Sequence, residues 1–91
     1  MNKKRETGWN VIISPQAEKA IKKLIPREQA RVRSVIDTME PGKPGQIDLK
    51  KMPELDLWRL RIGRWRAVLH IDFKKQIVWM LDFGARGDVY K

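Results

Sequence analysis

The spacing of the apolar residues changes near residue 41, and this change decides the fold class. Before it, apolar residues recur three and four positions apart, which places them on one helix face. They form two runs: Ala17, Ala20, Ile21, Leu24, Ile25, and then Val32, Val35, Ile36, Met39. After the connector 41–45, apolar and polar residues alternate, as in half-buried strands. Helices followed by strands predict an α+β domain.

Turn and cap residues set the expected boundaries of these elements. Ser14 and Pro15 supply an N-cap hydroxyl and a proline at the first helical position, and Pro26 separates the two helices. Strands are expected at Trp9–Ile13, Leu55–Ile62, Trp65–Asp72 and Gln76–Phe83. The predicted fold is therefore β-α-α-β-β-β, with two N-terminal helices on a twisted, mostly antiparallel four-stranded sheet. It forms one domain over residues 1–91, in which 1–7 is a flexible basic tail, and Trp9 and Trp79 belong to the core.

The composition excludes several classes of protein. The chain has no cysteine, which argues against a disulfide-stapled secreted protein and against zinc sites of the cysteine type. Hydrophobic residues make up 42% of the chain, enough to argue against intrinsic disorder. No apolar stretch approaches the ~18 residues of a membrane span. We expect a cytoplasmic protein without a membrane partner, a metal or another cofactor.

The charge balance points to a polyanionic partner. Twenty Lys and Arg residues oppose eleven Asp and Glu, which gives a formal charge of +9. The excess is spread along the chain: residues 1–46 hold ten basic and five acidic groups, and 47–91 hold ten and six. A basic domain of this kind is expected to bind nucleic acid or an acidic protein.

The segment Trp58–Arg66 predicts a tight hairpin that gathers arginines on one face. Gly63-Arg64 is a type II′ turn signature, which places Ile62 opposite Trp65 and Arg61 opposite Arg66. By the same register one face is apolar, and the other carries Arg59, Arg61, Arg66 and His70. Like charges directly opposite each other destabilise a sheet. Because arginine binds phosphate oxygens bidentately, the pattern favours an anion site over a merely solvated face.

Several motifs together resemble the RelE/ParE superfamily of bacterial toxins. They are the Arg-X-Arg strand at 59–61, the Gly-X-aromatic-Arg turn at 63–66 and the ending Arg-Gly-Asp-Val-Tyr at 86–90, with the helix pair and 49–53 also fitting. The resemblance implies a compact toxin that is neutralised by a cognate antitoxin protein. In the RelE branch such a toxin cleaves messenger RNA in the ribosomal A site, and in the ParE branch it poisons DNA gyrase.

The resemblance also implies which residues form the site. The matching catalytic positions are Arg59, Arg61, Arg66, Arg86 and Tyr90. Metal-independent cleavage uses the ribose 2′-hydroxyl as nucleophile, so arginines would stabilise the charge that develops on the phosphate. Tyr90 would stack on a base or handle a proton. Lys50 and Lys51, expected in the loop before the hairpin, and Arg64 in the turn would hold RNA phosphates.

Two departures from the family pattern leave the proton-transfer groups open. Lysines commonly stand where this chain has Arg59 and Arg61, and a lysine pKa is easily tuned whereas that of arginine is not. A histidine commonly precedes the terminal arginine, but Ala85 occupies that place. His70 shares the arginine face and is a candidate for proton transfer, although a lone strand histidine is more often structural. The first expectation is a ribosome-dependent endoribonuclease; the alternatives are a gyrase poison and a non-catalytic nucleic-acid-binding module.

Overall fold

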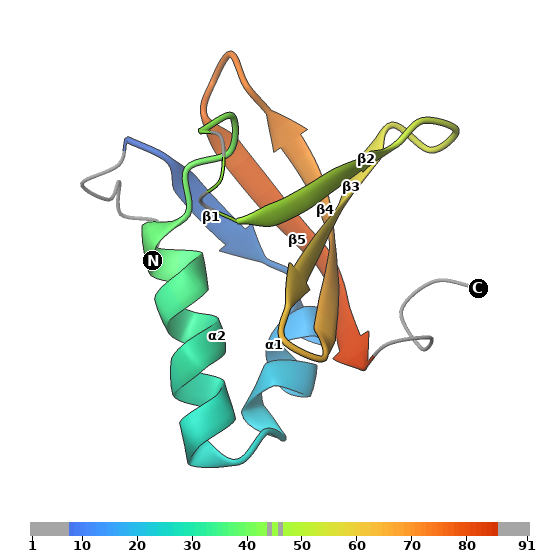
Figure 1. Cartoon of the computed structure of the whole chain (residues 1–91). Coiled ribbons are helices and arrows are strands. Elements are labelled where there is room, and N and C mark those ends of the chain that lie inside the picture. Colours follow the sequence, from blue (N-terminus) through green and yellow to red (C-terminus); the bar gives the residue numbers. More distant parts are fainter. Residues whose placement is uncertain (1–7, 44, 46, 86–91) are drawn as a thin grey trace.

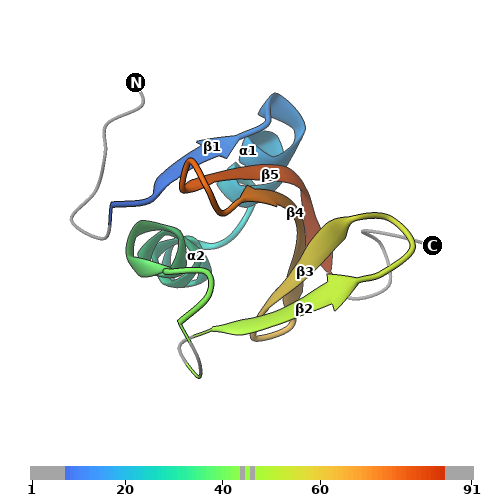
Figure 2. The same ribbon diagram turned by 90° about the horizontal axis from the view of Figure 1, so that it is seen from above.

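The computed structural model describes residues 8–43, 45 and 47–85. In chain order the elements are β1 (Asn10–Ile13), α1 (Pro15–Lys22), α2 (Pro26–Thr38), β2 (Asp48–Met52), β3 (Leu57–Ile62), β4 (Trp65–Asp72) and β5 (Ile77–Ala85). The two helices lie on one side of the sheet (Figure 1), and the sheet curves around α2 when it is seen from above (Figure 2). This arrangement confirms the predicted α+β class.

The described strands form one sheet in the order β1-β5-β4-β3-β2. β1 runs parallel to β5, and every other neighbouring pair is antiparallel. The sheet thus has five strands rather than the four predicted, because β2 occupies a segment that was expected to be a loop. β2 is an edge strand in which no residue is buried. It therefore lacks the apolar alternation by which strands are recognised in a sequence.

The helices begin where the cap residues predict. Ser14 Oγ accepts a hydrogen bond from the amide of Ala17 at 3.1 Å, and Pro15 is the first helical residue. The second helix begins at Pro26. Because α1 ends at Lys22, Ile25 no longer follows the helical period, and its side chain is 53% exposed instead of joining the core as predicted.

The core fills the space between the helices and the sheet. Its fully buried members come from both layers and include Ala17, Ile21, Val32, Met39, Leu60, Ala67, Leu69, Val78 and Met80. Trp9 is also buried, as predicted, with its ring edge-on to Phe73. The prediction for Trp79 is wrong: Val78 and Met80 point into the core, so the alternation of strand β5 turns Trp79 to the outer side of the sheet.

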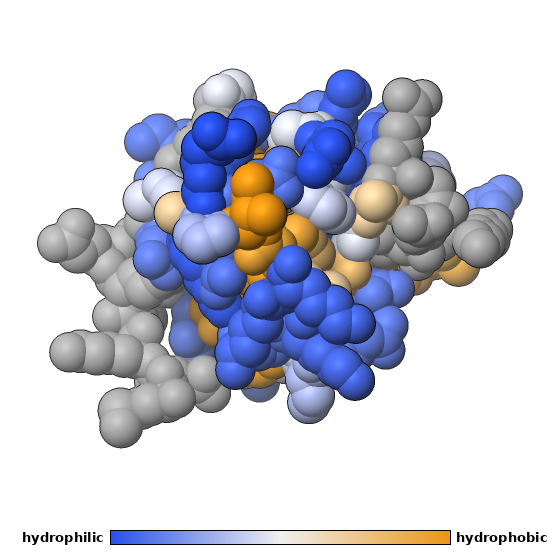
Figure 3. All heavy atoms as spheres, turned by 90° about the horizontal axis from the view of Figure 1, so that it is seen from below, coloured by the Kyte–Doolittle hydropathy of each residue, from blue (hydrophilic) through white to orange (hydrophobic). Residues whose placement is uncertain are grey.

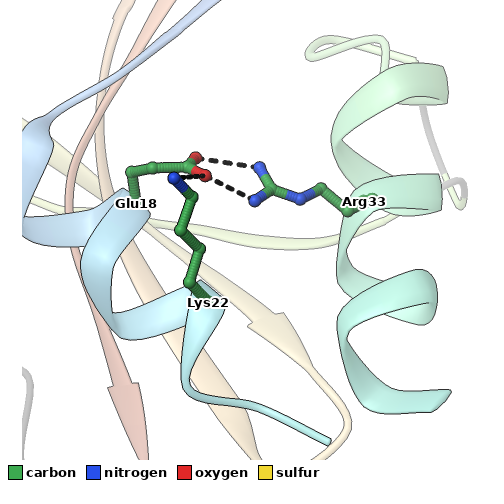
Figure 4. Close-up of polar contacts among 3 residues, drawn as sticks. All are labelled: Glu18, Lys22 and Arg33. Carbon is green, nitrogen blue, oxygen red and sulfur yellow. Dashed lines mark hydrogen bonds and ion pairs between the residues drawn. The ribbon is translucent and has the colours of Figure 1, made fainter. Parts of the chain in front are cut away.

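An ion pair joins the two helices on their outer surface. Nη1 and Nη2 of Arg33 both donate to the carboxylate of Glu18, Nη1 at 2.9 Å to Oε1, and Lys22 Nζ lies 3.9 Å from Oε2 (Figure 4). The hydrogen bond from Arg33 and the nearby positive charges hold the pKa of Glu18 below its ordinary value. Neither described helix is long and apolar enough to cross a lipid bilayer.

Candidate nucleic-acid interface

The β3–β4 hairpin has the register that the turn residues predict. Ile62 pairs with Trp65 and Arg61 with Arg66, and the pairing continues to Trp58 and Leu69. Gly63 has a φ of 58°, and Arg64 is not in the positive-φ region, as a type II′ turn requires. A Cβ at Gly63 would also lie 3.1 Å from Arg31 Nη1. The backbone conformation favours glycine at the turn, whereas the end of the exposed Arg31 side chain could move away from a Cβ.

Alternation along the strands separates an apolar face from a cationic one. Leu60, Ala67 and Leu69 point to the helices and are fully buried. The residues between them point away from the helices, on the opposite side of the sheet. We call this outer surface the cationic face and define it by Lys50, Arg59, Arg61, Arg66 and His70.

Arg61 lies between a like charge and an opposite one. On one side it is directly opposite Arg66 of β4, and on the other side it is opposite Asp48 of β2. Asp48 is a residue that sequence reasoning missed, because no strand was expected there. Its carboxylate offsets part of the repulsion between the two arginines. The face nevertheless keeps a cationic excess.

Lys50 lies directly opposite Arg59, on the same side of the sheet. Lys50 therefore belongs to a strand of the cationic face and not to a loop, which corrects the prediction. Arg59 is half-buried, and its Nε is covered. Both residues line a cavity of about 420 Å³ next to the β2–β3 turn. The neighbouring strand thus adds a lysine to the three arginines of the cationic face.

Lys51 is held away from the cationic face by contacts of its own. Its Nζ donates to Asp56 Oδ1 at 2.9 Å and lies 5.4 Å from the centroid of the Trp58 ring. The hydrogen bond and the positive charge of Lys51 lower the pKa of the exposed Asp56 carboxyl. The two adjacent lysines therefore have different surroundings, because successive strand residues point to opposite sides.

Arg64 is also separated from the cationic face. Its Nη2 lies 3.3 Å from Glu28 Oε2 of α2, and its guanidinium carbon lies 5.2 Å from the centroid of the Trp65 ring. These contacts place Arg64 at the end of the molecule where the β3–β4 turn meets α2. The structure thus brings Lys50, Arg59, Arg61 and Arg66 together on one side of the sheet. Lys51 is outside this group, although it also lines the cavity with Lys50 and Arg59, and Arg64 lies at the other end of the hairpin.

His70 lies on the cationic face, at its far end from Arg66. It pairs with Trp79 of β5, and the two ring centroids are 5.2 Å apart. Val68 stands between His70 and Arg66 along β4. Asp82 pairs with Val68, and its Oδ1 accepts hydrogen bonds from Gln16 Nε2 and the amide of Phe83, both at 2.9 Å.

Three of the residues singled out in the sequence lie outside the described part of the chain: Arg86, Asp88 and Tyr90. The described part ends with β5, whose Gly84 is paired with Arg66. Within the described ranges no group of three or more His, Asp or Glu residues is arranged to hold a metal ion.

A second surface lies at the end of the molecule formed by the α1–α2 and β3–β4 turns. Trp65 lines two cavities there, of about 470 and 500 Å³. The apolar residue Ile25 lines the first of them, and Leu24 lines the second. Their other lining residues include five cations: Lys19, Lys23, Arg27, Arg31 and Arg64. Seen from below, the molecule shows an apolar patch within a hydrophilic rim (Figure 3). We call this surface the helix-end patch.

Comparison with known proteins relates this fold to toxins of toxin–antitoxin complexes. No protein-family model and no curated protein matches the chain. Among solved structures, the toxin–antitoxin complex RelBE2 of Mycobacterium tuberculosis contains a chain that is 22% identical, with a TM-score of 0.72 over 97% of this chain and 100% of that one. The archaeal RelE–RelB complex of Pyrococcus horikoshii gives 26% identity and a TM-score of 0.66, over 88% and 97% of the two chains.

The intact RelBE complex of Escherichia coli is more distant. Its matching chain is 20% identical, with a TM-score of 0.57 over 82% of this chain and 93% of that one. In all three comparisons the alignment covers nearly the whole neighbouring chain. The resemblance to the RelE/ParE superfamily is thus confirmed, and the chain has the fold of a RelE-type toxin.

Proposed function

We propose that this protein is the toxin of a toxin–antitoxin pair and that it cleaves messenger RNA on the ribosome, in the cytoplasm. The observation that carries the proposal is the cationic face, where Arg59, Arg61 and Arg66 lie together with Lys50 although none of them is needed for the core. The RelE-type fold supports it, because the chain is similar to toxins in complexes with their antitoxins.

The proposed reaction needs no metal. The ribose 2′-hydroxyl attacks the adjacent phosphorus, a pentacoordinate phosphorane forms, and the bond to the 5′-oxygen breaks. The products are a 2′,3′-cyclic phosphate and a 5′-hydroxyl. A base must take the 2′-hydroxyl proton, and an acid must protonate the leaving oxygen.

The cationic face supplies charge stabilisation for this reaction. In our proposal Arg61 and Arg66 bind the non-bridging phosphate oxygens, with Arg86 as a third donor. Their guanidinium groups would stabilise the charge that grows at the phosphate in the transition state. Lys50 and Arg59 hold the neighbouring phosphate. His70 and Tyr90 are the candidate proton-transfer groups.

Replacement of one arginine tests the proposal. In a translating extract, we expect Arg66→Ala to slow message cleavage about 10²–10³-fold, the usual effect of losing one transition-state donor. Lys74→Ala, which removes an exposed cation from the β4–β5 turn, is the matched control and should cleave like the wild type. Circular dichroism would show that both variants are folded.

Three outcomes would contradict the proposal in different ways. Unchanged cleavage by Arg66→Ala would place the reaction elsewhere on the molecule. If the wild type leaves messages intact but accumulates cleaved gyrase–DNA complexes, it is a gyrase poison. If it binds RNA but neither cleaves messages nor arrests growth, it is a binding module.

We further propose that the cognate antitoxin covers the helix-end patch. The exposed apolar centre is surrounded by five cations and two carboxylates, Glu28 and Asp82, so the surface keeps an excess of positive charge. Such a surface complements an amphipathic segment with acidic flanks. Ile25→Asp should weaken binding of the co-expressed antitoxin at least about tenfold, because a charge replaces an apolar contact at the centre. Leu81→Asp changes a comparably exposed apolar residue outside the patch and should bind normally; equal weakening by both would contradict the assignment.

A further inference from the structure

The cavity beside the β2–β3 turn combines two kinds of lining. One side is cationic: Lys50 and Arg59 are paired across the two strands, and Lys51 also lines the cavity. The other side is formed by the turn itself, with the apolar residues Met52, Pro53 and Leu55 and the acidic residue Glu54. Its volume of about 420 Å³ lies in the range of small-ligand sites.

The turn that closes this cavity is held by local contacts. The amide of Leu55 donates to the carbonyl of Met52 at 3.2 Å, and Asp56 has a φ of 53°, a conformation that aspartate tolerates better than most residues. The bond from Lys51 to Asp56 fastens the turn to β2. The residues of the apolar wall are therefore held in place by contacts within the turn and with β2.

Leu55 is the most exposed large apolar residue in the described part of the chain, at 59%. It lies among charged groups, at the edge of the cationic face, and does not belong to the core. An exposed apolar side chain beside a concave, charged site is typical of a ligand-binding position. A nucleotide has the matching chemistry, since its phosphate is anionic and its base has a flat apolar surface.

We infer that this cavity binds the base of one message nucleotide and selects among bases. The inference rests on the proposed function, since it places the nucleotide's phosphate on Lys50 and Arg59. The base then lies on Leu55 and Met52. The carboxylate of Glu54 repels the phosphate, so the nucleotide has one favoured orientation in the cavity.

Glu54 gives the subsite its selectivity. A carboxylate accepts hydrogen bonds from exocyclic amino groups, such as N4 of cytosine. Uracil presents carbonyl oxygens at the corresponding edge and has no exocyclic amino group, so the carboxylate disfavours it. The subsite should therefore prefer cytosine to uracil by about tenfold, toward the lower end of what one well-placed base contact provides.

The direct test is binding of cytidine and uridine 3′-monophosphate to the full chain, measured by titration calorimetry at low salt. We expect the wild type to bind the cytidine nucleotide about tenfold more tightly. In Glu54→Gln the two nucleotides should bind with nearly equal affinity, because the glutamine amide can also donate to uracil. Asp37→Asn, which neutralises an exposed carboxylate on α2, should keep the wild-type ratio.

A second variant tests the apolar wall. Leu55→Ala should weaken the binding of both nucleotides several-fold and leave the ratio of their affinities unchanged. Leu81→Ala should weaken the binding of neither nucleotide. The subsite would be overturned if the wild type bound both nucleotides equally or bound neither. It would also be overturned if Glu54→Gln kept the wild-type ratio of the two affinities. Because Glu54 and Leu55 are exposed, loss of folding is not expected to obscure the result.

Mapping of message cleavage separates this inference from the proposed function. If both hold, Glu54→Gln shifts the distribution of cut positions toward uridine relative to Asp37→Asn. If the wild type cuts no message but prefers the cytidine nucleotide, the subsite stands and the endoribonuclease proposal fails. If messages are cut but the two nucleotides bind with equal affinity, the endoribonuclease proposal stands and the subsite fails.

Discussion

Leu60 and Arg61 are neighbours in β3 whose side chains have opposite surroundings. Leu60 is fully buried against the helices, whereas Arg61 is exposed on the outer side of the sheet, opposite Arg66. On the helix-facing side, apolar contacts stabilise the fold. On the outer side, like charges are brought together at a cost to the sheet. We infer from this difference that one side of these strands stabilises the fold and that the other side binds an anion.

The largest effect on stability should come from the helix-facing side. Leu60→Ala removes a side chain with no exposed surface and leaves a cavity, so the free energy of unfolding should fall by about 2–5 kcal/mol. Urea denaturation followed by tryptophan fluorescence measures this loss. A change below about 1 kcal/mol would mean that the core can collapse around the cavity and that the contrast between the two sides is weaker than we describe.

A smaller, pH-dependent effect should come from the ion pair on the helix surface. Glu18→Gln removes a carboxylate that Arg33 holds through two hydrogen bonds, so we expect a loss of about 1 kcal/mol at neutral pH. The folded-state pKa of Glu18 lies below its ordinary value of 4.5. The stabilisation is therefore complete above that value and disappears as the pH falls through the lowered one.

Urea titrations of the wild type and of Glu18→Gln at several pH values test this prediction. The two proteins should differ at pH 7 and converge in acid. Glu54→Gln, which removes an exposed carboxylate from the β2–β3 turn, serves as the control for a general change in charge. A difference that persists unchanged in strong acid would show that the carboxylate form of Glu18 is not the stabilising species.

The smallest effect should come from the outer side, and it should have the opposite sign. Arg61→Gln removes the repulsion from Arg66, so stability should rise by a few tenths of a kcal/mol at most. The gain is limited because Asp48, opposite Arg61 on β2, loses a neighbouring positive charge. A loss of more than about 1 kcal/mol would contradict the view that this side chain is dispensable for folding.

The sequence was sufficient for features that depend on local chemistry. The turn at Gly63-Arg64 has one favoured geometry, and strict alternation on both sides of it determines which residues share a face. The register of Arg61 with Arg66 and the start of α1 at Ser14 were therefore predictable.

Features that depend on distant parts of the chain were not predictable in the same way. β2 is stabilised by pairing with β3 and not by an apolar pattern of its own, so Asp48 and the orientation of Lys50 were missed. Arg64 is drawn toward α2 by Glu28, which is distant in the sequence. Trp79 was assigned to the core by its size, although its strand position turns it outward.

Above all, we propose that the cationic face serves an attack by the ribose 2′-hydroxyl on a message bound to the ribosome. Analysis of the RNA ends produced by the wild type in a translating extract tests it most directly. We expect a 2′,3′-cyclic phosphate and a 5′-hydroxyl, and no cut where the scissile nucleotide carries a 2′-O-methyl group. Fragments with a 3′-hydroxyl and a 5′-phosphate, or cutting that tolerates the methyl group, would contradict it.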